Sequence, residues 1–223
     1  MASVKIHITP EKVSAQTCVL IDVLRATSSI VAALANGAKY VLAVSTLKEA
    51  RRLKKKDVIL AGERNTVKPK GFDLGNSPRS LKEEIVKGKG IVLTTTNGTK
   101  ALRLLSCQNT VAASFLNISA TIEYLQNEQE IHIICAGTKG RFSLEDFLLA
   151  GFIAGLDPNP LDEAAVAKAL AENVRNVENL ILKSSHARRL IELGMEEDIK
   201  FCLKKDLYST VPVLKNGKFV AWK

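Results

Sequence analysis

The stretch Val92–Leu102, VLTTTNGTKAL, begins like an apolar strand and ends like a helix. Between the two parts lie three threonines, Thr94–Thr96, followed by Asn97 and Gly98. Such a junction supplies hydroxyl groups, an amide and a backbone that can adopt positive φ. A strand that passes through a polar loop into a helix is a repeating unit of α/β folds.

The same unit recurs along the chain and determines the fold that we expect. Continuous apolar runs such as Ile131–Cys135 indicate strands covered on both faces. Strands are expected at Val4–Thr9, Cys18–Leu24, Tyr40–Val44, Asp57–Ala61, Gly90–Thr94, Thr110–Ser114 and Ile131–Cys135. Helices are expected at Ser28–Asn36, Leu47–Lys55, Thr99–Leu105, Ser119–Asn127 and Ser143–Leu156. The alternation predicts an α/β fold with a largely parallel sheet between helical layers.

The C-terminal part of the chain departs from this alternation. Leu161–Lys183 is mostly helical in pattern, and Asn216-Gly217 between apolar runs is typical of a type I′ hairpin. Because no linker-like or low-complexity run interrupts the chain, we expect residues 1–223 to form a single domain.

Composition excludes several classes of protein. The chain has 223 residues, is 46% hydrophobic and carries a net charge of +9, but only 5% of its residues are aromatic. Since no basic stretch interleaves aromatics, we expect no nucleic-acid partner, and no apolar run is long enough to suggest a membrane span. Without a visible secretory signal we expect a cytoplasmic protein, and a homo-oligomer is compatible with the sequence. The four cysteines are scattered, which favours reduced thiols over a disulfide or zinc framework.

The first polar junction is Ile21–Ser29, IDVLRATSS. It places Asp22 near a strand end, then Arg25, and then Thr27 or Ser28 as a cap for the next helix. A carboxylate for a metal, a guanidinium for an oxyanion and a helix N-terminus together make a phosphate site. The alternative is a buried Asp22–Arg25 ion pair beside an ordinary helix cap.

Two further junctions have a similar character. In the opening stretch, Thr95, Thr96 and Thr99 surround Asn97-Gly98, which is either an anion cradle or a capped turn but lacks the P-loop pattern. In Cys135–Phe147, CAGTKGRFSLEDF, the site candidates are Gly137, Thr138, Glu145 and Asp146. The two acids fall in the first turn of a helix, where the helix dipole favours acidic residues in any case.

A long loop and a fourth junction complete the set of polar segments. The loop GERNTVKPKGFDLGNSP contains Glu63, Arg64, Asp73 and Asn76. Loops of this length inside compact domains are often functional. Ser114 and Asn117 of SFLN lie between a strand and a helix, where an ordinary N-cap is the alternative to a binding role.

Cys135 and Arg141 have the C-x5-R spacing of cysteine-dependent phosphatases. A thiolate with a lowered pKa could therefore act as a nucleophile. However, Ile134 precedes the cysteine where those enzymes have histidine, and a small thiol that ends an apolar strand is usually core.

Seven blocks in order resemble the 2-phosphosulfolactate phosphatase family. They are DVLRATSSIVAAL, AGER, GFDLGNSP, TTTNGTKAL, SFLN, CAGTKGRFSLEDFLLAG and SSHARRLIELGMEEDIKFC. The resemblance implies a three-layer α/β/α fold around a mixed sheet. It also implies a Mg²⁺-dependent acid phosphatase that acts on a small phosphorylated anion, 2-phosphosulfolactate, and releases sulfolactate. The chain departs from the family in GERNTVKP, where glycines commonly follow the arginine.

Carried over block by block, the resemblance implies a set of site residues. They are Asp22, Arg25, Glu63, Arg64, Asp73, Asn76, Asn97, Gly98, Thr99, Glu145 and Asp146. We expect Asp22 with Glu145 and Asp146 to hold Mg²⁺, Arg25 to meet the phosphoryl group, and Arg64 to meet the sulfonate or carboxylate. The general acid stays open, although His186 is the one histidine of three that lies in a matched block, and His132 is expected in strand core. The rival hypotheses are the cysteine-dependent phosphatase and a non-catalytic anion- or nucleotide-binding protein.

Overall fold

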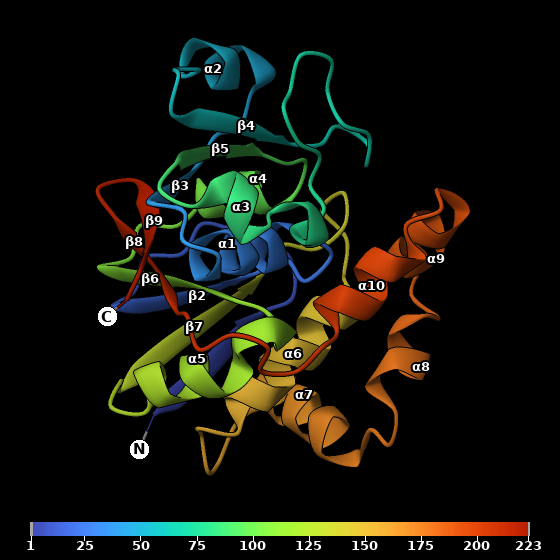
Figure 1. Cartoon of the computed structure of the whole chain (residues 1–223). Helices are drawn as coiled ribbons and strands as arrows, with labels where there is room; N and C mark the ends of the chain where they lie inside the picture. Colours follow the sequence, from blue (N-terminus) through green and yellow to red (C-terminus); the bar gives the residue numbers. More distant parts are fainter. Residues whose placement is uncertain (1, 223) are drawn as a thin grey trace.

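A computed structural model describes residues 2–222 and shows a mixed sheet in that part of the chain (Figure 1). The strands are β1 Ser3–His7, β2 Thr17–Ile21, β3 Tyr40–Ala43, β4 Val58–Gly62, β5 Gly90–Thr94, β6 Asn109–Ala113, β7 Glu130–Cys135, β8 Pro212–Lys215 and β9 Lys218–Ala221. Their order is β1-β7-β2-β6-β8-β9-β3-β5-β4. Neighbours among β1–β7 pair in parallel, whereas β8 and β9 pair antiparallel with each other, with β6 and with β3. The predicted mixed, largely parallel sheet is confirmed.

Helices cover both faces of the sheet. They are α1 Ala26–Ala35, α2 Leu47–Arg52, α3 Glu83–Val86, α4 Gly98–Leu102, α5 Ile118–Leu125, α6 Leu144–Ala154, α7 Asp162–Asn173, α8 Val177–Ile181, α9 Ser185–Glu192 and α10 Glu196–Cys202. Alternate strand residues face opposite cores: Val19 and Ile21 join the core under α5, α6 and α7, whereas Cys18 and Leu20 join the core under α1, α3 and α4. The three-layer α/β/α arrangement follows from this alternation.

Helix α1 is buried on all sides. Its sequence ATSSIVAALA contains no charged residue, and the residues from Ala26 to Leu34 are all buried. The strands arch around this helix, which contacts β3, β6, β8 and β9 (Figure 1). Because a helix without a polar face needs cover on every side, the arch explains how this segment is accommodated. The arch also brings the two groups of parallel strands toward one another.

The ends of α1 differ in part from expectation. Asn36 and Gly37 end the helix as predicted, with Gly37 at φ 86°. Neither Thr27 nor Ser28 caps its start, because both lie inside the helix and bond back to the preceding loop. The carboxylate of Asp22 takes the cap role instead by accepting a bond from the Ala26 N–H group at 3.3 Å.

The C-terminal hairpin forms where it was predicted but lies in an unexpected place. Asn216 and Gly217 have φ 50° and 75°, as a type I′ turn requires. The hairpin fills the middle of the sheet, with Val213 opposite Val111 of β6 and Phe219 opposite Val41 of β3. The predicted helical stretch Leu161–Lys183 divides into α7 and α8, and two helices that were not predicted, α9 and α10, follow it. Within residues 2–222, no helix is long and apolar enough to cross a membrane.

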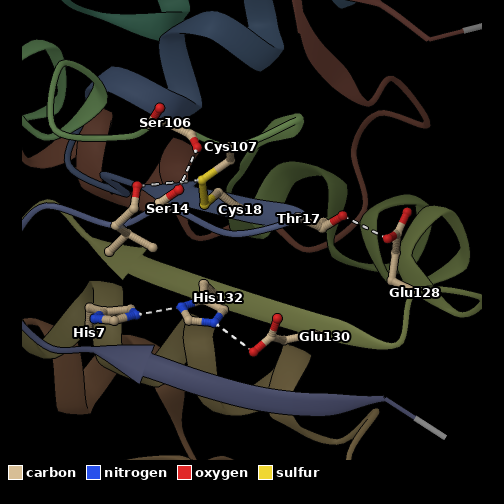
Figure 2. The surroundings of a disulfide bond; sticks show 10 residues. His7, Ser14, Thr17, Cys18, Ser106, Cys107, Glu128, Glu130 and His132 are labelled. Carbon is tan, nitrogen blue, oxygen red and sulfur yellow. Dashed lines mark hydrogen bonds and ion pairs between the residues drawn. A yellow bond between two sulfur atoms is a disulfide. The ribbon is translucent and has the colours of Figure 1, made fainter.

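One expectation about the cysteines was wrong. Figure 2 shows that Cys18 of β2 and Cys107, just before β6, are joined by a disulfide. The two strands are parallel neighbours with Thr17 opposite Asn109, so their first residues lie side by side. The sequence separation of 89 between the two cysteines hides this proximity in the sequence. Cys135 and Cys202 are free and buried, as expected.

Candidate functional site

A cavity of ≈ 710 Å³ lies at the edge of the sheet where the parallel strands end. Its lining comes from the three polar junctions, from the long loop after β4 and from α9. The lining residues are Asp22, Leu24, Arg25, Glu63, Asn65, Thr66, Asn76, Thr95, Thr96, Asn97, Thr138, Lys139, Arg141, Phe142, Ser185, His186 and Arg189. The polar segments that stand out in the sequence therefore share one rim.

Side-chain bonds tie the junctions to one another. Asp146 accepts from the Val23 N–H group at 2.9 Å and from the Gly137 N–H group at 3.1 Å, which joins the first and third junctions. Asn97 joins the second and third junctions by accepting from the Lys139 N–H group at 3.1 Å. These bonds satisfy backbone N–H groups that would otherwise have no protein partner, so they fix the shape of the cavity.

Asp22 is a buried carboxylate in the cavity wall and is 5% exposed. A Cβ atom on Gly98 would lie 2.7 Å from its Oδ2 atom, so glycine is needed for the close approach of the second junction. Burial raises the pKa of Asp22 to about 6, although the charge of His186 opposes the rise. The ion pair with Arg25, which was the alternative to a phosphate site, does not form, because Arg25 pairs with Asp198 of α10.

Glu63 connects the long loop to the second junction. Its Oε1 atom accepts from the Thr96 N–H group at 2.6 Å, and its Oε2 atom accepts from the Thr66 N–H group at 2.7 Å. Both oxygens are therefore engaged with the backbone. Glu63 lines the cavity, and its two hydrogen bonds link two of the loops that form the cavity wall.

His186 enters the cavity wall from the first turn of α9. Its Nδ1 atom lies 3.2 Å from Glu145 Oε1 and 3.1 Å from Thr138 Oγ1. Glu145 is 1% exposed; burial tends to raise its pKa, but the hydrogen bond and charge of His186 outweigh burial and lower it. A charged carboxylate on Nδ1 fixes the orientation of the imidazole ring. The Nε2 atom makes no hydrogen bond among the described residues.

A smaller cavity of ≈ 180 Å³ adjoins this pair, and Glu145 and His186 both line it. The second oxygen of Glu145, Oε2, is buried without a hydrogen-bond partner among the described residues. The other histidines lie elsewhere: His132 is buried on β7, as expected, and its Nδ1 atom lies 2.9 Å from His7 Nε2 (Figure 2). His186 is thus the histidine that the structure brings to the predicted site.

Several predicted site residues do not line either cavity. Arg64 donates to the carbonyl oxygens of Glu63 and Ser45 and to Thr94 Oγ1, at 2.6 to 2.7 Å. Asp73 accepts from the Leu60 N–H group at 2.7 Å. These bonds anchor the ends of the strands outside the two cavities. The expectation that Arg64 meets a sulfonate or carboxylate is not supported.

Ser114, Asn117 and Thr99 are likewise used inside the fold. Ser114 and Asn117 are fully buried, and the Asn117 side chain accepts from the Ser114 N–H group and donates to the Thr210 carbonyl. Thr99 donates through Oγ1 to the Thr95 carbonyl at 2.7 Å. The ordinary-cap interpretation therefore fits Ser114 and Asn117, and Thr99 bonds back to the preceding turn, while Thr95 and Thr96 line the cavity.

Cys135 is not positioned as a nucleophile. It is 0% exposed in the core beneath α6 and lines neither cavity, whereas Arg141 lines the larger one. Burial, and then the charges of Asp146 and Glu145, raise the pKa of its thiol well above the ordinary value. Because the thiolate is the reactive form, the cysteine-dependent mechanism is wrong for this site.

The structure does not bring the expected metal ligands Asp22, Glu145 and Asp146 to one cavity. Asp146 has both oxygens on backbone donors and lies outside the cavities, and burial followed by the charges of Asp22 and Glu145 raises its pKa. No cluster of three or more His, Cys, Asp and Glu residues in 2–222 could hold a metal ion. Two buried oxygens of residues that line the larger cavity have no hydrogen-bond partner among the described residues, namely Asn76 Oδ1 and Thr96 Oγ1. Together with Asp22 they fit a hard cation such as Mg²⁺, which needs only one or two carboxylates beside a phosphate and water.

Most of the basic side chains that line the cavity were not predicted from the sequence as site residues. Lys139, Arg141 and Arg189 join Arg25 around the cavity. Arg141 had been considered only as a partner for the cysteine, and Arg189 sits on α9, whose place beside the junctions no local pattern reveals. Four cations and a cradle of loop amides would attract an anion with more than one charged group.

A buried carboxylate, a cradle for an anion and a histidine with its own carboxylate are the parts that hydrolysis of a phosphate ester requires. The fold and this site define a phosphoric monoester hydrolase of the α/β class. The chain belongs to the 2-phosphosulpholactate phosphatase family, whose model matches residues 4–217.

Individual relatives support the same assignment. A protein of Thermotoga petrophila named probable 2-phosphosulfolactate phosphatase is 54% identical over 211 residues, which cover 93% of each chain. A protein of Pseudothermotoga lettingae with the same name is 46% identical over 95% of each chain. A third, from Clostridium perfringens, is 41% identical over 95% of this chain and 91% of its own.

Proposed function

We propose that this protein hydrolyses 2-phosphosulfolactate, or a closely related phosphorylated 2-hydroxy acid, to sulfolactate and inorganic phosphate. The observation that carries the proposal is the convergence of Asp22, Arg25 and the His186–Glu145 pair on one cavity at the strand ends. The names of the relatives supply the substrate, and the cavity supplies the chemistry that such a substrate needs.

The basic residues would bind the anionic groups of the substrate. Arg25 is 4% exposed at the start of α1, so it is placed for the phosphoryl group, whose charge it would share with the loop amides. Arg141 and Arg189 line the same cavity and replace Arg64 as candidates for the sulfonate and carboxylate.

His186 is placed to act as the general acid. Water attacks phosphorus, the bond from phosphorus to the ester oxygen breaks, and that oxygen takes the proton from Nε2 of His186. Glu145 holds Nδ1 at 3.2 Å and balances the charge of the protonated ring before the transfer. A secondary alkoxide is a poor leaving group, so the proton matters to the rate.

We propose that Mg²⁺ assists the reaction, held by Asp22 and oxygens of the substrate with Asn76 Oδ1 as a further oxygen of the same cavity. When bound, the ion would offset charge on the phosphoryl oxygens and activate water. Ionised Asp22 serves this purpose without Glu145 or Asp146.

A cytoplasmic location and a single domain over residues 1–223 stay predictions, as does a homo-oligomer.

The direct experiment is phosphate release from a panel of phosphorylated 2-hydroxy acids, each with added Mg²⁺ and with excess EDTA. We expect 2-phosphosulfolactate to give the highest kcat/KM, turnover to stop in EDTA, and Mg²⁺ to restore it. Full activity in EDTA would remove the metal from the proposal. Tight binding of the panel without any phosphate release would favour the non-catalytic anion-binding protein.

A further inference from the structure

We infer that Asp198 is a positioning residue, which fixes Arg25 and the Asn76–Ser77 turn from behind the cavity wall. The proposal rests on the proposed phosphatase function and goes beyond it. It assigns a role to α10, a helix that does not line the cavity.

Asp198 lies where three segments meet. Its Oδ2 atom forms an ion pair with Arg25 Nη1, and the two side chains are 7% and 4% exposed. Its Oδ1 atom accepts a hydrogen bond from Ser77 Oγ at 2.7 Å, and Arg79 Nη1 lies 3.8 Å from the same oxygen. Both oxygens of this buried carboxylate are thus engaged by cations or donors from outside α10.

The partners of Asp198 either line the cavity or lie next to a residue that lines it. Arg25 lines it, and Ser77 follows Asn76, whose Oδ1 atom is buried without a partner and belongs to a lining residue. A second bond, from Ser29 Oγ to the Asn76 carbonyl oxygen at 3.1 Å, holds the same turn against α1. One carboxylate therefore sets the place of two lining residues that are far apart in the sequence.

The ion pair also determines which part of Arg25 is available. A guanidinium has donors on two edges, and Asp198 occupies Nη1. The remaining donors can meet a phosphoryl group in a fixed direction, whereas a guanidinium without this anchor would have several orientations. Loss of orientation weakens binding to the transition state more than binding to the ground state, so kcat should fall more than KM rises.

The test compares Asp198→Asn and Asp198→Glu with the wild-type chain. Asp157→Asn is the matched control, because Asp157 is also buried and accepts from two backbone N–H groups, but lies outside both cavities. Steady-state kinetics with 2-phosphosulfolactate give kcat and KM. NMR of ¹⁵N-labelled arginine side chains reports the Arg25 guanidinium directly, with Arg25→Lys used to assign its signal.

We expect Asp198→Asn to lower kcat about 10- to 100-fold with KM changed less than about threefold, the usual cost of losing a supporting contact. The Arg25 guanidinium signal should lose its protection from exchange with water, and Asp198→Glu should recover part of both effects. Asp157→Asn should leave kcat and that signal unchanged. An Arg25 signal that stays protected in Asp198→Asn, or equal losses of kcat in Asp198→Asn and Asp157→Asn, would overturn the inference. Because the NMR measurement needs no turnover, it separates this outcome from failure of the proposed phosphatase function.

Discussion

At the scale of single residues, the site is defined by buried charges whose partners differ from those that the sequence indicated. Asp22, Arg25 and Glu145 are all at most 5% exposed, so each must be compensated within the protein. Arg25 forms an ion pair with Asp198, and Glu145 pairs with His186. Asp22, in contrast, accepts hydrogen bonds only from backbone N–H groups. Asp22 is therefore the one of these two carboxylates that has no hydrogen-bonded cationic or histidine partner among the described residues.

The buried charge of Asp22 predicts a pH-dependent stability. Its pKa rises from 3.8 to about 6 on folding, so between these pH values the folded state binds more protons than the unfolded state. The free energy of unfolding must then fall as pH rises. Relative to Asp22→Asn, which cannot titrate, the wild-type chain should lose about 2 kcal/mol between pH 4 and pH 7. Urea unfolding of both chains without Mg²⁺ measures this difference, and a constant difference across the range would contradict the assignment.

Cys135 provides a test of the rejected mechanism. As a fully buried thiol in the core it contributes volume, so Cys135→Ala should lower the free energy of unfolding by about 1 kcal/mol. We expect kcat to stay within about twofold of the wild-type value, because the side chain lines neither cavity. A loss of several orders of magnitude in kcat, with an unchanged circular dichroism spectrum, would restore the cysteine as nucleophile.

At the scale of elements, the sequence predicted the junctions well and the bonds between them poorly. The strands and first helices were found within a few residues because apolar runs and turn residues mark them locally, as in Gly90–Thr94. Whether a polar residue faces the cavity or anchors a strand end depends on neighbours distant in the sequence. Arg64 was therefore assigned to the substrate, although it holds the ends of β3, β4 and β5.

Arg64 and Arg25 should respond to the same substitution in opposite ways. Arg64→Lys cannot reach three acceptors with one ammonium group, so the free energy of unfolding should fall by about 1–2 kcal/mol, while kcat/KM changes little. Arg25→Lys should lower kcat about 10²-fold, because a point charge does not reproduce the geometry of the guanidinium. Thermal unfolding and steady-state kinetics of both variants make the comparison. A specific rise in KM for the sulfonated substrate in Arg64→Lys would return Arg64 to the binding site.

At the scale of the whole molecule, long-range pairing completes both the sheet and the site. The hairpin β8–β9 lies between the two groups of parallel strands. Helix α10 carries Asp198 to a loop 173 residues earlier, and α9 carries His186 to a loop 48 residues earlier. The turn Asn216-Gly217 predicts a hairpin but not its neighbours. Similarly, His186 was recognised from its block, while its contact with Glu145 depends on the path of the intervening helices.

The central hairpin should be essential for folding. A chain that ends at Thr210 loses the strands between β6 and β3 and uncovers core positions that Val213 and Phe219 fill. Burying two such side chains contributes several kcal/mol, a large part of the about 5–15 kcal/mol that stabilises a domain. We expect this truncated chain to lack a cooperative thermal transition, whereas a chain that lacks only residues 222–223 retains one. A cooperative transition near the wild-type temperature in the shorter chain would show that the hairpin is dispensable.

The most direct test of the account is the rate of phosphate release by His186→Gln. With 2-phosphosulfolactate, whose leaving oxygen needs a proton, kcat should fall about 10²- to 10⁴-fold relative to the wild-type chain. With an aryl phosphate such as p-nitrophenyl phosphate, whose leaving group departs without a proton, the fall should be less than about tenfold. A wild-type rate for His186→Gln on 2-phosphosulfolactate would contradict the assignment of this cavity as the catalytic site.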